Sequence, residues 1–149
     1  MTPKSNSYIL LIEDNDDDIE LTKLAFNQNK FANNIVVKKD GEEALDYLIG
    51  NNFEAIKEHG QPVFILLDLK LPKVDGLEVL KELKNHKETS NIPVIVLTSS
   101  KEEDDILKGY ALGANSYVRK PVNYDRFVKT VNTLGIYWLA INEPPTSTQ

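Results

Sequence analysis

The sequence contains no cysteine and only two histidines among its 149 residues. The absence of cysteine excludes disulfides, thiolate catalysis and zinc–thiolate sites, and is compatible with a reducing compartment. His59 and His86 fall in a polar segment and near the end of a predicted helix, so we interpret both as surface residues. Zinc and iron sites are therefore not expected.

Basic residues and long apolar runs are also scarce. Seventeen lysines and arginines stand against 23 acidic residues, which gives a net charge of -6 and argues against binding to nucleic acid or to an anionic membrane. Residues 1–7 are polar and do not resemble a signal peptide, and the longest apolar runs have the length of a strand rather than of a membrane span. We expect one domain, because a chain of this length supplies one hydrophobic core. Because residues 1–7 do not resemble a signal peptide, we expect this domain in the cytoplasm.

Three apolar runs without alternation are typical of strands that are buried on both faces of a parallel sheet. They cover residues 8–12, 63–67 and 92–97, and two weaker runs cover residues 35–37 and 116–118. An amphipathic helical pattern follows each run. The strict alternation of strand and helix predicts a small doubly wound α/β domain, with a parallel sheet and helices on both of its faces.

Polar residues follow four of the five predicted strands. These residues are Glu13 and Asp14, Asp68, Thr98, and Lys120. Each alone could be an ordinary polar strand end that meets water. Together they would lie at the carboxyl edge of the sheet, where such folds bind their ligands. Three carboxylates in one cleft repel each other unless a cation or protons compensate, and Mg²⁺ suits them because it prefers oxygen ligands.

An aspartate beside Mg²⁺ can act as a nucleophile towards phosphorus. Lys120 would then supply a positive charge for one phosphoryl oxygen, and the Thr98 hydroxyl could donate a hydrogen bond to another. The sequence therefore predicts that Asp68 accepts a phosphoryl group.

The motif LLDLKLPKVDG around Asp68, together with Lys120-Pro121 after the fifth strand, resembles the receiver domain of bacterial response regulators. The resemblance covers about residues 8–135. It implies a five-stranded parallel sheet in the flavodoxin-like order 2-1-3-4-5. It also implies a proline after Lys120 whose peptide bond is often cis, an isomer that fixes a tight turn.

The same resemblance implies a role for each acidic residue. Asp68 would be phosphorylated by a histidine kinase, and Glu13 and Asp14 would serve the metal. Lys70, two residues after the aspartate, would lend its backbone carbonyl to Mg²⁺. We therefore expect a signalling protein that catalyses only its own phosphotransfer and dephosphorylation, and not an enzyme.

The resemblance further assigns a switch to Thr98, Tyr117 and Pro121. A phosphoryl group adds about 1.5 to 2 negative charges, which can draw Thr98 inward and leave space for Tyr117. The surface that changes shape, and that we expect to carry the output, consists of the fourth helix, the fifth strand and the fifth helix (residues 106–111, 116–118 and 127–138).

Two segments exceed what a receiver needs. Residues 50–62 form a polar connection that is longer than the usual two to six residues or so. The last helix continues beyond residue 135, so we divide the chain into a tail (1–7), a receiver domain (8–135) and an extension (136–149). Both features, and the lack of a DNA-binding domain after the receiver, resemble stand-alone response regulators that pair with bacterial and cyanobacterial phytochrome kinases.

The extension contains surplus apolar residues. Ile136, Tyr137 and Ile141 have no obvious partner within the domain, so we expect a homodimer through the output surface and the extended helix. The alternative is that the extension folds back on its own domain.

Three other functions are compatible with parts of the pattern. A haloacid-dehalogenase-like enzyme would carry an acid where Lys70 stands. A Rossmann-type nucleotide binder would have a G-x-G-x-x-G motif or a P-loop after a strand, and neither is present. A pseudo-receiver, which binds proteins without being phosphorylated, usually lacks part of the site, whereas the whole set is present in this sequence.

Overall fold

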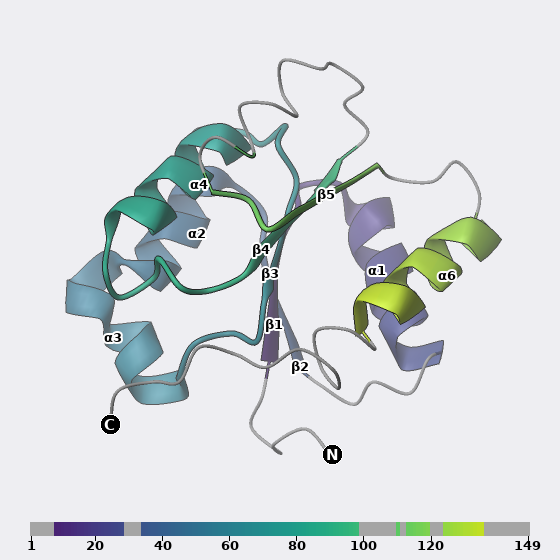
Figure 1. Ribbon diagram of the computed structural model, residues 1–149, viewed down its shortest axis with the longest axis horizontal. Helices are drawn as coiled ribbons and strands as arrows, with labels where there is room; N and C mark the ends of the chain where they lie inside the picture. Colours follow the sequence, from purple (N-terminus) through teal and green to yellow (C-terminus); the bar gives the residue numbers. More distant parts are fainter. Residues whose placement is uncertain (1–7, 29–33, 99–109, 111–112, 120–123, 136–149) are drawn as a thin grey trace.

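The computed structural model describes residues 8–28, 34–98, 110, 113–119 and 124–135. Within them, five parallel strands form one sheet in the order β2-β1-β3-β4-β5 (Figure 1). The strands are β1 (Tyr8–Ile12), β2 (Asn34–Lys38), β3 (Ile65–Leu67), β4 (Val94–Thr98) and β5 (Ser116–Arg119). The predicted doubly wound parallel sheet and its strand order are therefore confirmed.

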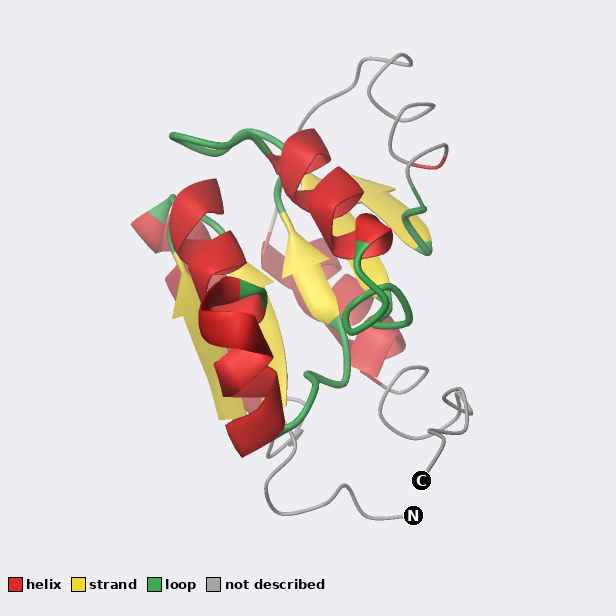
Figure 2. Cartoon of the chain, turned by 90° about the vertical axis from the view of Figure 1, so that its left-hand side faces the viewer, coloured by secondary structure: helices red, strands yellow, loops and turns green. Residues whose placement is uncertain are grey.

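Helices cover both faces of this sheet. They are α1 (Asp16–Gln28), α2 (Gly41–Leu48), α3 (Gly50–His59), α4 (Gly76–Asn85) and α6 (Tyr124–Gly135). The helices α1 and α6 lie on one side, and α2, α3 and α4 lie on the other (Figure 1). Figure 2 looks onto the layer of α2 to α4, with the strands behind it. No described helix is long and apolar enough to cross a membrane.

The central strands are apolar throughout because each of their faces packs against a separate core. Leu10 and Ile12 belong to a buried cluster with residues of α2 and α4, whereas Ile9 and Leu11 belong to a second cluster with residues of α1. Successive side chains of a strand point to opposite faces, so one unbroken run serves both clusters. Each fully buried aliphatic side chain contributes about 1.5 to 3 kcal/mol to folding.

The long polar connection predicted over residues 50–62 is mostly helix, which corrects the sequence interpretation. Helix α3 occupies Gly50–His59 and follows α2 directly, with three residues in the left-handed region (Asn51, Asn52 and Phe53, φ 53°, 58° and 61°) that turn the chain between them. The Phe53 ring meets the His86 ring edge-on, with 5.7 Å between centroids. Ile56 packs against the core, but Phe53 stands in the left-handed region, so the segment shows no regular helical spacing of apolar residues.

Some predictions fall outside the described residues. They concern residues 1–7, most of the predicted fourth helix, Lys120 with Pro121, and the extension 136–149.

Candidate metal centre

Three carboxylates meet at the carboxyl edge of the sheet. Glu13 and Asp14 directly follow β1, and Asp68 directly follows β3. These two strands are parallel neighbours in which Ile12 pairs with Leu67, so the residues that follow them emerge side by side. The Asp68 amide donates to the Ile12 carbonyl at 3.0 Å. One carboxylate oxygen from each acid lies within 4.8 Å of the others.

Two of these carboxylates are almost completely buried. Glu13 is 3% exposed and Asp68 is 8% exposed, whereas Asp14 is exposed. The Glu13 carboxylate accepts a hydrogen bond from the Asn15 amide at 3.2 Å, and Asp68 Oδ1 accepts one from the Lys70 amide at 3.2 Å. Backbone amides thus hold both groups in place. Negative charges that are so close and so buried favour a compensating cation, and an all-oxygen donor set suits a hard divalent ion.

The turn from β1 into α1 fixes the acidic pair. Asn15 stands between the pair and the helix, and its side-chain oxygen accepts a hydrogen bond from the Asp18 amide at 3.0 Å. This bond caps the start of α1, as asparagine commonly does. Asn15 was not among the predicted site residues, although its place before a run of acids is a typical helix-start signal.

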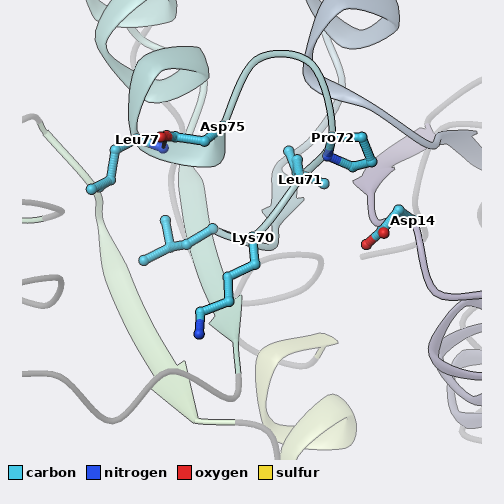
Figure 3. Close-up of a pocket in the computed structure, with 7 residues that line it drawn as sticks. Asp14, Lys70, Leu71, Pro72, Asp75 and Leu77 are labelled. Atoms are coloured by element: carbon cyan, nitrogen blue, oxygen red, sulfur yellow. Dashed lines mark hydrogen bonds between the residues drawn. The ribbon is translucent and has the colours of Figure 1, made fainter.

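A pocket of about 350 Å³ adjoins Asp14 (Figure 3). Its other walls come from the segment that joins β3 to α4 and from the start of α4. Asp14 faces Leu71 and Pro72 across the pocket, and the Lys70 side chain extends away from the Asp14 carboxylate (Figure 3). Asp14 belongs to both the pocket and the acidic cluster, so the pocket adjoins the cluster on its solvent side.

The remaining predicted residues are described only in part. Thr98 ends β4 and its backbone pairs with Arg119 of β5, so the chain reaches this edge of the sheet where Lys120 follows. The side chains of Thr98 and Tyr117, and the whole of Lys120 and Pro121, lie outside the described residues.

The sequence matches the model of the response regulator receiver domain over residues 9–132. The chain belongs to this family, which confirms the resemblance stated from the sequence.

Relatives match over nearly the whole chain. The probable methanogenesis regulatory protein FilR2 of Methanothrix harundinacea is 41% identical over 92% of this chain and 86% of its own length. The response regulator Rcp1 of Synechocystis sp. is 36% identical over 93% of this chain and 95% of its own length.

Solved structures show the same fold. The phosphorylated cyanobacterial phytochrome response regulator RcpA superposes with a TM-score of 0.85 at 37% identity, covering 94% of this chain and 99% of its own. The Mn²⁺-bound form of Rcp1 superposes with a TM-score of 0.83 at 35% identity, over 94% and 99% of the two chains. The expected likeness to phytochrome-associated response regulators is therefore confirmed.

Proposed function

We propose that this chain is a phosphoacceptor response regulator and that Asp68 takes its phosphoryl group from a histidine kinase. The observation that carries the proposal is the convergence of Glu13, Asp14 and Asp68 within 4.8 Å at the carboxyl edge of a receiver fold. RcpA, a relative with the same fold, is known in a phosphorylated form. Asp68 would attack phosphorus as the bond to the kinase histidine nitrogen breaks, giving an acyl phosphate and a neutral imidazole.

We propose Mg²⁺ as the metal, held directly by the carboxylates of Asp14 and Asp68 and by the Lys70 backbone carbonyl, with the Glu13 carboxylate acting through a bound water. The ion, when bound, offsets negative charge on the phosphoryl oxygens. The oxygen-only donor set supports this assignment, as does the Mn²⁺-bound form of Rcp1. The hydrogen bond from the Lys70 backbone amide to Asp68 Oδ1 restrains rotation of the carboxylate and so orients it for attack.

We propose that Lys120 and the Thr98 hydroxyl hold the transferred group, and that Thr98, Tyr117 and Pro121 form the switch. The sensor would be a histidine kinase of the phytochrome class in the cytoplasm. The relation to RcpA, a phytochrome response regulator, supports this partner.

Intact mass after incubation with acetyl phosphate and Mg²⁺ tests the acceptor. Wild-type protein should gain one phosphoryl group and Asp68→Asn none. Asp46→Asn, which changes an exposed aspartate of α2, is the matched control and should be labelled like the wild type. A full phosphoryl mass increment in Asp68→Asn would contradict Asp68 as the acceptor. A wild-type protein that neither acetyl phosphate nor a kinase labels would instead be a pseudo-receiver.

We also infer that the protein forms a homodimer through the output surface and the extension 136–149. The apolar residues Ile136, Tyr137 and Ile141 motivate this inference, since burying such side chains in each protomer stabilises association. Light scattering coupled to size exclusion, with and without beryllofluoride, should give a dimer mass at micromolar concentration. Tyr137→Glu should shift it to a monomer, and a dimer that this substitution leaves unchanged would contradict the interface.

A further inference from the structure

The segment that joins β3 to α4 (residues 68–75) is held firmly at its far end by the start of α4. The Gly76 amide donates to the Leu69 carbonyl at 2.8 Å. A Cβ at Gly76 would lie 2.4 Å from the Asp68 carbonyl oxygen, a distance that no real side chain tolerates. Glycine is therefore required because two stretches of backbone touch.

A tight turn forms the outer part of this segment. Lys73 has φ 68°, and the Val74 amide donates to the Pro72 carbonyl at 2.8 Å, two residues back. This is a γ-turn of the rarer kind, with its central residue at positive φ. Lys73 is exposed, and its ammonium nitrogen lies 3.7 Å from Asp40 Oδ2.

The turn is seated on the first residue of α2. The Gly41 amide donates to the Pro72 carbonyl at 3.3 Å. A Cβ at Gly41 would lie 1.8 Å from the Val74 carbonyl oxygen and 2.8 Å from its Cβ. Asp40 fixes this end of α2, because its side chain accepts a hydrogen bond from the Glu43 amide at 2.7 Å. Only glycine lets the turn approach so closely.

We propose that the turn Pro72–Val74, seated on Gly41, positions the Lys70 backbone carbonyl for the metal. This inference rests on the proposed function, which makes that carbonyl a ligand. Lys70 stands between two restraints. Its backbone amide donates a hydrogen bond to Asp68, and two residues later the Pro72 carbonyl accepts one from the Gly41 amide. Groups that orient a ligand without touching the metal govern affinity, since a ligand must be held to within about 0.5 Å. Gly41 and Lys73 are thus positioning residues.

A matched pair of glycine substitutions tests the contact between Gly41 and the turn Pro72–Val74. Calorimetry with Mg²⁺ alone should show about tenfold weaker binding for Gly41→Ala. Gly50→Ala also adds one methyl group at the start of a helix, but its Cβ would meet only the Asp46 Cβ at 3.9 Å. Its Mg²⁺ affinity should equal that of the wild type.

A second pair, at the exposed Lys73, keeps the test decisive if Gly41→Ala fails to fold. Both Lys73→Gly and Lys73→Val remove the ion pair with Asp40, but glycine accepts positive φ and a β-branched residue resists it. Lys73→Gly should retain wild-type affinity for Mg²⁺, and Lys73→Val should weaken binding severalfold. Equal affinities within the Lys73 pair, or within a folded glycine pair, would overturn the positioning role.

Labelling of the same proteins separates this inference from the proposed function. A wild type that binds Mg²⁺ but is labelled neither by acetyl phosphate nor by a kinase contradicts Asp68 as acceptor. The ratios of Mg²⁺ affinity between variants still test the positioning role of the turn. A wild type that is labelled, with unchanged affinity in the variants, contradicts the turn alone. A wild type that binds no Mg²⁺ removes the metal site and the inference together.

Discussion

The two edges of the sheet bury polar groups in opposite ways. At the amino edge, Tyr8 is 5% exposed and its hydroxyl donates to the Gly60 carbonyl at 2.7 Å, so one neutral bond satisfies it. At the carboxyl edge, Glu13 and Asp68 are equally buried but are carboxylates that lie close to Asp14. The first arrangement stabilises the fold by itself, whereas the second is favourable only with a compensating charge. The difference distinguishes a structural contact from a binding site.

The two edges also differ in why each requires a glycine. Gly76, at the carboxyl edge, is required because backbone atoms of Asp68 and Leu69 leave no room for a Cβ. Gly60, at the amino edge, has open space around it but adopts φ 81° and ψ 173°, a conformation that side chains disfavour. Close packing thus requires glycine at Gly76, and backbone conformation favours glycine at Gly60.

The largest expected effect comes from Gly76→Ala. The added methyl group forces backbone apart, so the free energy of unfolding should fall by about 3 kcal/mol. Gly60→Ala should cost about 1.5 kcal/mol, the strain of its conformation alone. Urea denaturation of both variants gives the two values. A smaller cost at Gly76 than at Gly60 would contradict the contrast between packing and conformation.

An intermediate effect is expected when the carboxylates are removed singly. Asp14→Ala should weaken Mg²⁺ binding by more than about tenfold, because we propose Asp14 as a direct ligand. Glu13→Ala should weaken it less, since its role at this position is expected to run through water. Calorimetry without phosphate measures both. Equal losses of Mg²⁺ affinity, or none, would contradict the assignment of Asp14 as a direct ligand and of Glu13 as a ligand through water.

The smallest effect should appear at the amino edge. Burial, followed by the neighbouring Tyr47, raises the pKa of the Tyr8 phenol above its usual range. Tyr8→Phe loses one hydrogen bond and should lower the free energy of unfolding by about 1 kcal/mol at pH 8.

The pH dependence of that difference follows from the raised pKa. Above pH 10 or so, the unfolded chain releases the phenol proton while the folded protein keeps it, so wild-type stability falls with pH by up to about 1.4 kcal/mol per pH unit. Tyr8→Phe lacks this contribution, and the gap between the two proteins should close by about pH 11. Tyr110→Phe, at an exposed tyrosine, is the control. A gap that stays constant to pH 11 would argue that Tyr8 ionises normally in the folded state.

The sheet could be predicted because its signals are local. A run such as residues 8–12 is apolar at every position, and this pattern has one simple explanation in a strand covered on both faces. The meeting of Glu13, Asp14 and Asp68 followed from the same source, since parallel strands end at one edge.

The parts that were missed depend on contacts between distant residues or on unusual backbone conformations. The left-handed residues Asn51 to Phe53 interrupt the helical period, so α3 was taken for a connection. The seat of Pro72 on Gly41 depends on positive φ at Lys73, a residue type that rarely adopts it. Periodicity carries no trace of either feature.

The position of β3 within the sheet has a consequence for amide hydrogen exchange. Ile65, Leu66 and Leu67 are fully buried, and strands flank them on both sides, so their amides should exchange with solvent only when the whole domain opens. The edge strand β2 is paired on one side only and is partly exposed, so its amides should exchange through smaller openings. Asp68, the proposed acceptor, follows β3 directly and is therefore anchored to one of the interior strands whose amides we expect to exchange slowly.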